Sequence, residues 1–324
     1  MVYLFDIAGS YDEASLLNER RSQCCTANSF TISLHTMGSE IAQVQRIDRS
    51  ENFTDLETVN KVNEETRPYL EADKPWKGDL FPPETRRCTN LVGRSKTARE
   101  KWVVDPLIRK ITSTFLDKTT SNYYGETKHT QTSEAILSIA MTFDIGPGAK
   151  AQRLHRDDKN FHIDHQDQSA TGYQVGSDVM MNFMVPGVKT TFENGATLAI
   201  PGSHLWGSDR VPRMGKATVA EMDVTDVWVM LGGLYHAGGA NITQEHRILN
   251  GFFFCRGCYR QEENPYLCNS AADVLSWSPE VQRIMGYELS SPNIGFVHFK
   301  TPLQHLRGDQ IEEFGDFDAS QEAK

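Results

Sequence analysis

The strongest constraint on the fold is a switch to period-two alternation at about residue 133. Larger apolar side chains then occupy every second position as far as Ile145, and smaller or polar ones mostly lie between them. Because alternate residues of an extended chain point to opposite faces, this pattern predicts a strand. Further short apolar runs follow at 178–185, 196–200, 225–231 and 248–255, separated by Gly, Pro, Asn or Asp. This rhythm favours an antiparallel sandwich or barrel, since βαβ units would need helical crossovers between the strands.

Helical spacing flanks this β region on both sides. The first helix is predicted at about 54–66, with Asp55 and Glu57 near its start and Pro68 limiting its extent. A second helical segment is predicted over about 95–120, where apolar residues recur at three- and four-residue spacings. Shorter helices are expected around 271–275 and 279–285. The fold class is therefore mainly β with flanking helices (α+β).

The chain shows no internal repeat and no long low-complexity linker, which favours one elaborated domain. We expect residues 1–50 to be irregular, residues 51–308 to form the domain with its β core at about 133–260, and residues 309–324 to form a loose acidic tail.

The composition narrows the classes of partner. The net charge of −10 argues against a nucleic-acid ligand, because such affinity comes mainly from clustered Lys and Arg. No apolar run approaches the roughly 18 residues of a membrane span. The amino terminus has no basic region before its first acid, Asp6, so it does not resemble a secretory signal. We therefore expect a cytoplasmic protein with a small-molecule or protein partner, whose six cysteines remain thiols.

Three His-x-Asp pairs are the first candidates for chemistry, since an imidazole and a carboxylate two residues apart on an extended chain can bind one ion. They begin at His155, His162 and His165. The pair His155 and Asp157 follows the predicted strand and a Gly-Pro-Gly turn, whereas the other two pairs lie in a polar stretch. We therefore select the first pair and expect the other two to be surface residues.

A distant second histidine would complete a metal site, and His236 is the candidate. It ends the apolar run at 227–234 and precedes a Gly-Gly turn. Two histidines and one carboxylate form the facial triad of non-haem Fe(II) oxygenases, although His236 alone could equally be a hydrogen-bonded histidine at a strand end. Arg247, eleven residues later, lies where the chain returns along the neighbouring strand. It could hold a ligand carboxylate near the metal or form a surface ion pair with Glu245.

Four separated strings of the sequence, in the right order, resemble the phytanoyl-CoA dioxygenase family. More narrowly, they resemble its fungal natural-product branch, which modifies terpenoids and alkaloids. The resemblance covers about residues 54–299 and is carried by Gly146-Pro-Gly-Ala-Lys-Ala-Gln152-Arg-Leu-His155-Arg-Asp157-Asp158, Glu193-Asn-Gly-Ala-Thr197-Leu-Ala-Ile-Pro-Gly-Ser-His204, His236-Ala-Gly-Gly-Ala-Asn241 with Arg247, and Arg260-Gln-Glu-Glu-Asn-Pro-Tyr-Leu267.

The resemblance implies a double-stranded β-helix, or jelly roll, with helices packed outside it. His155, Asp157 and His236 match the iron ligands of the family. Arg247 matches the residue that pairs with the distal carboxylate of 2-oxoglutarate. Gln152 and Thr197 match further contacts of this cosubstrate. The family's entry strand before the first helix is not obvious in residues 1–50.

The activity so implied is an Fe(II)- and 2-oxoglutarate-dependent dioxygenase, which uses O2 to oxidise a lipophilic small molecule in secondary-metabolite biosynthesis. Decarboxylation of 2-oxoglutarate is coupled to removal of a hydrogen atom from the substrate. The alternatives are an acyl-CoA hydroxylase, which should display several basic residues for its phosphates, and a non-catalytic partner subunit, which should lack part of the site. Members of this branch are often dimers, so a homodimer is also an expectation.

Two other motifs are given structural interpretations. Cys255 and Cys258 have the spacing of a zinc knuckle, but no second pair completes four ligands. Ser203 and His204 are adjacent, so on a strand they would point to opposite faces, which does not suit a nucleophile and its base.

Overall fold

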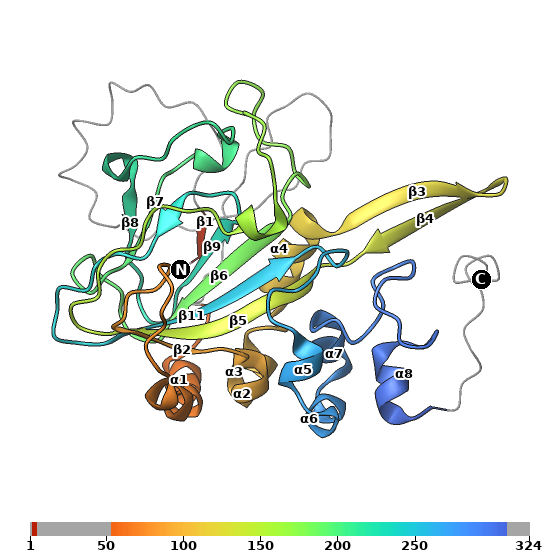
Figure 1. The fold of residues 1–324 in the computed structure, drawn as a ribbon, viewed down its shortest axis with the longest axis horizontal. Helices are drawn as coiled ribbons and strands as arrows, with labels where there is room; N and C mark the ends of the chain where they lie inside the picture. The colour runs from red at the N-terminus through yellow and green to blue at the C-terminus, as the bar shows by residue number, and fades with distance from the viewer. Residues whose placement is uncertain (1, 5–52, 310–324) are drawn as a thin grey trace.

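The computed structural model describes residues 2–4 and 53–309, and a six-stranded sheet lies at its centre (Figure 1). Its strand order is β1-β9-β6-β11-β5-β2, antiparallel throughout except for the parallel pair β1 and β9. The strands are β1 (Val2–Leu4), β2 (Thr85–Cys88), β5 (Ile136–Ile145), β6 (Met180–Pro186), β9 (Val227–Leu231) and β11 (Arg247–Cys255). The predicted strand at 133–145 and three of the four later apolar runs are thus strands of one sheet.

The fourth run belongs to a smaller sheet of order β10-β7-β8, formed by β10 (His236–Ala237), β7 (Thr197–Ala199) and β8 (Thr218–Ala220). The two sheets face each other: Ala199 and Ala220 of the small sheet share a hydrophobic cluster with Met184 and Phe253 of the large one. Two facing antiparallel sheets of this kind form a jelly roll, which confirms the predicted fold class.

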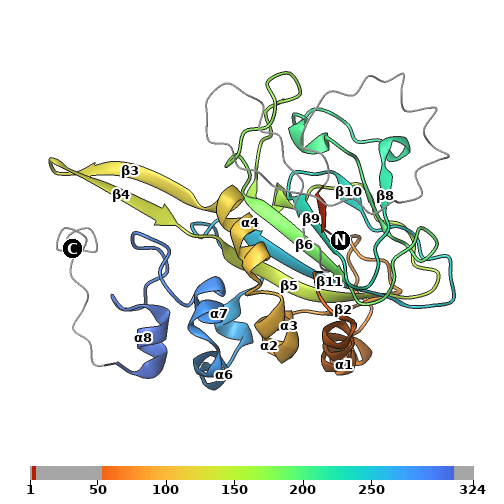
Figure 2. The ribbon, with the colours of Figure 1, turned by 180° about the vertical axis from the view of Figure 1, so that it is seen from behind.

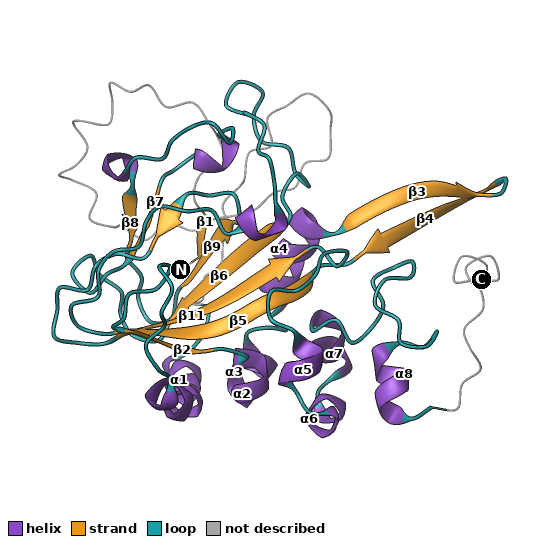
Figure 3. Ribbon diagram, in the orientation of Figure 1, coloured by secondary structure: helices purple, strands orange, loops and turns teal. Residues whose placement is uncertain are grey.

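Helices cover the other face of the large sheet; most of them lie below it in Figures 1 and 3, whereas α4 lies near β6. They are α1 (Leu56–Ala72), α2 (Leu91–Arg94), α3 (Lys96–Lys101), α4 (Pro106–Leu116), α5 (Pro265–Cys268), α6 (Ala271–Ser276), α7 (Pro279–Ile284) and α8 (Pro302–Arg307). A second hydrophobic cluster fills this interface, in which Trp102 packs edge-on against Phe252 of β11 with ring centroids 6.0 Å apart. Strand β11 is therefore buried on both faces, because the small sheet covers one face and the helices cover the other.

The first helix begins as predicted but ends later than expected. Asp55 caps it by accepting a hydrogen bond from Thr58 N over 2.7 Å. The prediction that Pro68 limits the helix was wrong, since α1 continues to Ala72 with Pro68 inside it. Pro68 only removes one backbone donor. Leu70 lies beyond it and is buried, so the packing of the last turn offsets the lost hydrogen bond.

The prediction of one helix at 95–120 was wrong in two respects, because the segment forms two helices and the second ends before residue 120. The structure divides it into α3 and α4, because Pro106 begins a new helix with Asp105 as its cap. After Leu116 the chain forms a hairpin of β3 (Lys118–Tyr124) and β4 (Thr127–Ser133), which projects from the body (Figure 2). Both strands are mostly polar and exposed, so no hydrophobic period marked them. Gly125, with φ of +61°, permits their tight turn.

Several expectations concern the ends of the chain. Of the N-terminal segment 1–50, Val2–Leu4 forms the edge strand β1, so this part of it is not irregular and supplies a strand before the first helix. Residues 5–50, and the predicted acidic tail beyond Asp309, lie outside the described residues. Within the described parts of the chain, no helix is both long and apolar enough to cross a bilayer.

Candidate metal centre and its cavity

His155, Asp157 and His236 meet between the two sheets. Nε2 of His155 lies 3.4 Å from Oδ1 of Asp157, and Nε2 of His236 lies 3.4 Å from Oδ2. One potential ligand atom from each residue falls within 4.8 Å of the other two. The structure thus brings together the three residues that the sequence selected, at a spacing that one metal ion can bridge.

Backbone hydrogen bonds fix this arrangement. His155 and His236 form an antiparallel bridge, with reciprocal N–H to carbonyl bonds of 2.9 and 3.0 Å. The amide of Asp157 donates to the carbonyl of Gly232 over 3.0 Å. The Gly232-Gly233 bend therefore holds the backbone that carries the carboxylate. A side chain at Gly232 would also collide with Met180, since its Cβ would lie 2.7 Å from that of Met180.

Both imidazoles are oriented by backbone carbonyls. Nδ1 of His155 lies 2.8 Å from the carbonyl oxygen of Arg153, and Nδ1 of His236 lies 3.0 Å from that of Leu234. A carbonyl oxygen only accepts, so each Nδ1 carries the proton and each Nε2 offers its lone pair to the site. Second contacts of this kind are the usual support of metal-binding histidines.

The charges of the site favour the forms that bind a metal. Burial raises the pKa of Asp157, but the neighbouring His236 and His155 outweigh it and hold this pKa below its usual range. Burial lowers the pKa of His236, which keeps its ring neutral, although Asp157 opposes this effect. An ionised carboxylate and a neutral imidazole are the ligand forms of these residues.

Asn182 is a residue of the site that the sequence did not reveal. It is fully buried on β6, and its Nδ2 donates to Oδ2 of Asp157 over 2.6 Å. A single asparagine in an apolar strand belongs to no recognisable motif, so the sequence alone could not identify it. Its role depends on the register that places β6 behind Asp157.

A cavity of about 300 Å³ adjoins the three residues. Its walls are largely apolar and come mainly from the large sheet and from the loop before β2, with Leu80, Phe81, Pro82, Ile139, Met141, Phe143, Ile145, Met180, Met184, Leu249 and Phe253 among them. The cavity is large enough for a small organic ligand and suits an apolar one.

Arg247 contributes a cation to this cavity. It is only 2% exposed, and neither Nε nor Nη1 has a hydrogen-bond partner. Burial lowers the pKa of its guanidinium to about 10. The sequence left a surface ion pair with Glu245 as an alternative, and this was wrong because Arg247 is buried. A buried guanidinium with unused donors is a site for an anionic ligand, since such groups are otherwise paired.

Gln152 and Thr197 line the same cavity. Gln152 also supports the loops around it: its Oε1 accepts from Gly238 N over 2.8 Å, and its Nε2 donates to the carbonyl of Leu80 over 3.0 Å. Thr197 is buried on β7.

The other two His-x-Asp pairs do not join the site, but they differ from each other. His162 is exposed, as expected. The expectation of a surface position was wrong for His165, whose Nε2 lies 3.0 Å from Oδ2 of the buried Asp158. Its partner is thus not Asp167, and the pair ties the loop after Asp157 to the core.

The remaining motifs do not contribute to the triad. Cys255 is buried and Cys258 is exposed, and among the described residues the triad is the only group of three metal-ligating side chains. Ser203 accepts a hydrogen bond from Tyr235 N at 2.8 Å, within a buried turn.

Comparisons with known proteins identify similar sequences and folds. Residues 49–249 match the model of the phytanoyl-CoA dioxygenase family. The dioxygenase swnH1 of Arthroderma benhamiae is 34% identical over 261 residues, covering 77% of this chain and 81% of that protein. The dioxygenase peniF of Penicillium patulum is 31% identical, covering 79% and 83%. The structure of HygX from Streptomyces hygroscopicus with nickel and 2-oxoglutarate bound aligns with a TM-score of 0.44 at 15% identity, covering 65% of this chain and 82% of that one.

Most of the described jelly roll and all three residues of the triad lie inside the matched region. The chain belongs to the phytanoyl-CoA dioxygenase family and is a dioxygenase.

Proposed function

We propose that this dioxygenase depends on Fe(II) and 2-oxoglutarate and oxidises a lipophilic small molecule of secondary metabolism. The observation that carries the proposal is one shared cavity, which holds two histidines and an aspartate at metal-binding spacing and a buried guanidinium with unused donors. The triad suits a metal ion and the guanidinium suits an anion, so together they fit a 2-oxo acid that is bound to a metal.

His155, Asp157 and His236 would hold the iron. Two neutral imidazoles and one carboxylate form a donor set that leaves metal positions open, which is the arrangement of non-haem Fe(II) oxygenases. The Nδ1 contacts already direct both Nε2 atoms inward, so a metal would need little rearrangement of the rings.

Arg247 would bind the far carboxylate of 2-oxoglutarate. A guanidinium can bind a carboxylate through charge-assisted hydrogen bonds, and Nε and Nη1 of Arg247 are both without a partner. Gln152 and Thr197 would add contacts to this cosubstrate: Thr197 through its hydroxyl, and Gln152 through the amide hydrogen that Leu80 does not use.

When bound, the iron supplies the oxidation that couples decarboxylation of 2-oxoglutarate to removal of a hydrogen atom from the substrate. The chain contributes position and exclusion of water. Phe81 and Phe143 of the cavity wall pack with ring centroids 5.7 Å apart, and Gln152 holds Leu80 against the Gly238 turn. These contacts close the apolar part of the cavity around a lipophilic substrate.

The relatives support a role in secondary metabolism, since swnH1 and peniF are fungal dioxygenases and align over most of their length. A terpenoid or an alkaloid would suit the cavity. An acyl-CoA would need several cations for its phosphates, whereas Lys150 and Lys159 are the only lysines among the described residues that line the cavity.

The experiment is an anaerobic ultraviolet-visible titration of the metal-free protein with Fe(II) and then with 2-oxoglutarate. A charge-transfer band that requires both additions is the expected result. The variant Arg247→Met should lose the band at moderate 2-oxoglutarate concentrations, whereas the exposed control Arg213→Met should keep it. Absence of the band in folded wild-type protein would contradict the proposal and would favour a non-catalytic partner subunit.

Two further properties are part of the proposal. One is a cytoplasmic location. We also infer a homodimer, which sedimentation equilibrium tests directly because a monomer would have a mass of 36.5 kDa.

A further inference from the structure

Glu262 places a carboxylate in the cavity wall, away from Arg247. Strand β5 shows the separation: Arg247 pairs with Ile145 at one end of the strand, and Glu262 bonds to Ser138 near the other. The two positions are seven residue steps apart, which is roughly 23 Å at about 3.3 Å per strand residue. One five-carbon diacid cannot occupy both ends, so the wall near Glu262 is free for a different molecule.

A β-bulge produces the position of Glu262. The pairing of β5 with β11 shifts between Phe253, opposite Ile139, and Phe254, opposite Leu137, which leaves Ser138 without a partner in the ladder. Its hydroxyl donates to Oε2 of Glu262 over 3.0 Å and accepts from Glu262 N over 3.1 Å. Bulges often redirect a side chain beside a functional site.

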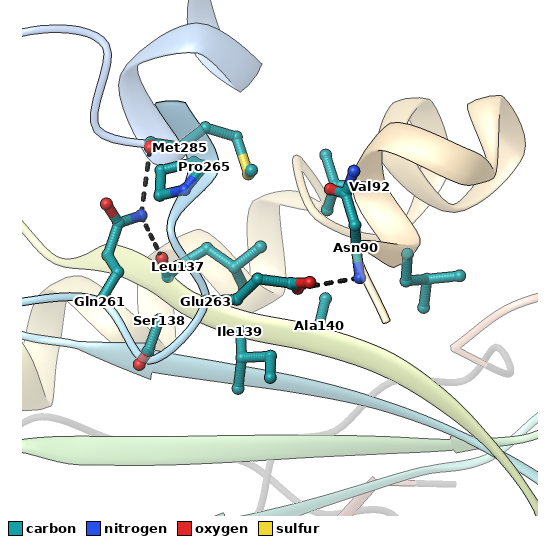
Figure 4. A pocket seen from close by; sticks show the side chains of 11 residues that line it. Asn90, Val92, Leu137, Ser138, Ile139, Ala140, Gln261, Glu263, Pro265 and Met285 are labelled. Carbon is teal, nitrogen blue, oxygen red and sulfur yellow. Dashed lines mark hydrogen bonds between the residues drawn. The ribbon is translucent and has the colours of Figure 1, made fainter. Parts of the chain in front are cut away.

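The neighbours of Glu262 anchor the segment from the opposite side. Gln261 donates to the carbonyls of Leu137 (2.6 Å) and Met285 (3.1 Å), and Glu263 accepts from Asn90 N over 2.8 Å. Figure 4 shows both side chains at a small pocket on the helix side of β5. That pocket has a volume of about 10 Å³, room for no more than one water. Glu262 alone of the three reaches the large cavity.

The carboxylate is oriented but not neutralised. Asn160 Nδ2 donates to Oε1 and Ser138 to Oε2, so each oxygen retains a lone pair. No cation of the described residues forms an ion pair with it. Lys159, the nearest lysine, donates instead to the carbonyl of Arg156 over 3.1 Å. Glu262 is also exposed, so a ligand can reach it.

The surroundings specify what such a ligand must be. Partial burial raises the pKa of Glu262, while its bonds to Asn160 and Ser138 oppose this rise. The adjacent walls are apolar, including Ile139, Met180 and Phe253. A ligand with an apolar body and one cationic nitrogen would match both surfaces, and a second anion would be repelled.

We propose that Glu262 is a specificity-determining residue that binds a protonated amine of the substrate, so that the substrate is a lipophilic amine. This inference rests on the proposed function, because it assigns the substrate of the same cavity. The ammonium group would donate hydrogen bonds to the free lone pairs of a carboxylate already held by Ser138 and Asn160. The apolar body would then lie along the wall toward the triad.

The experiment compares ligands that differ only in charge. Isothermal titration calorimetry at pH 7.5 would measure n-octylamine, n-octanol and octanoate, and the matched cyclohexylmethyl amine and alcohol. The full-length protein would be used, with and without Co(II) and 2-oxoglutarate. We expect each amine to bind about tenfold more tightly than its alcohol, which corresponds to about 1.4 kcal/mol, because a charge-assisted hydrogen bond is stronger than a neutral one.

Glu262→Gln keeps the shape of the side chain and removes its charge. It should abolish the preference for amines while leaving alcohol affinity unchanged. The matched control Glu263→Gln, one residue away on the helix side, should keep the preference. Three results would each overturn the inference. They are equal binding of amine and alcohol in both the octyl and the cyclohexylmethyl series, no binding of either amine, and an unaltered preference for amines in Glu262→Gln. If one of these results were obtained but Fe(II) and 2-oxoglutarate still produced the charge-transfer band, the proposed function would remain intact. Loss of the band in wild-type protein would instead refute that function.

Discussion

Asn182 donates a hydrogen bond from Nδ2 to Oδ2 of Asp157 over 2.6 Å, from a strand 25 residues further along the chain. Asn182 is fully buried, and its own Oδ1 has no hydrogen-bond partner. The asparagine therefore leaves an amide oxygen unsatisfied in the core while it orients the aspartate. This contact places Asn182 as a positioning residue for the proposed metal ligand.

Replacing Asn182 with Leu should weaken metal binding without removing a ligand. Loss of such a supporting contact typically reduces metal affinity by about 10- to 100-fold. Calorimetric titration with Co(II) would measure the change, and thermal unfolding would verify that the variant is folded. The exposed hairpin variant Asn122→Leu serves as the control. Unchanged Co(II) affinity in Asn182→Leu would show that Asp157 needs no such support.

Arg247→Met should have opposite effects on cosubstrate binding and on stability. It removes the cation that would bind 2-oxoglutarate, so binding of this cosubstrate should be lost. It also removes a buried charge whose Nε and Nη1 are unpaired, and an apolar replacement should raise the free energy of unfolding of the ligand-free protein by about 1–4 kcal/mol. Urea denaturation measures the second effect. A less stable variant would mean that Arg247 is paired in solution.

The two remaining His-x-Asp pairs should respond differently to mutation. His162→Ala should leave both metal binding and stability unchanged, because the side chain is exposed. His165→Ala should retain the metal but lower the free energy of unfolding by about 1–3 kcal/mol, since it leaves the buried Asp158 without its partner. His155→Ala, by contrast, should abolish iron-dependent turnover. Loss of iron by His162→Ala but not by His155→Ala would reverse the assignment.

Asp178 should make stability depend on pH. Burial raises the pKa of this carboxyl from 3.8 to about 6, although its hydrogen bond from Tyr173 opposes the shift. The folded protein therefore holds this proton more tightly than the unfolded chain. The resulting stabilisation is complete below about pH 4 and is lost as the pH rises through about 6. The loss is on the order of 3 kcal/mol.

Asp178→Asn should flatten this dependence, because the amide has no proton to lose and still accepts from Tyr173. Urea denaturation at pH 5 and pH 7.5 would compare the variant with wild-type protein. The exposed variant Asp164→Asn should retain the wild-type slope. If Asp178→Asn shows the full wild-type loss between these two pH values, another group is responsible.

The sequence identified most of the strands and the central residues of the site. Strand β5 was predicted from its alternating apolar residues, because such alternation indicates a strand without any knowledge of distant contacts. His155 and Asp157 share a short motif beside that strand, and His236 and Arg247 lie at either end of one turn. Each pair is close along the chain, so local geometry could select its members, whereas the meeting of the two distant pairs was implied by the family resemblance.

The structure decided what depends on contacts between distant segments. The hairpin of β3 and β4 was missed because its strands are polar on both faces, and Pro68 was misjudged because the packing of Leu70 outweighs one lost hydrogen bond. Asn182 and Asp157, or Ser138 and Glu262 at 124 residues apart, meet only through strand register and a bulge. The periodicity of the sequence indicates on which face of a strand a side chain lies. The residue that it contacts on that face depends on how the strands pair and how the sheets pack.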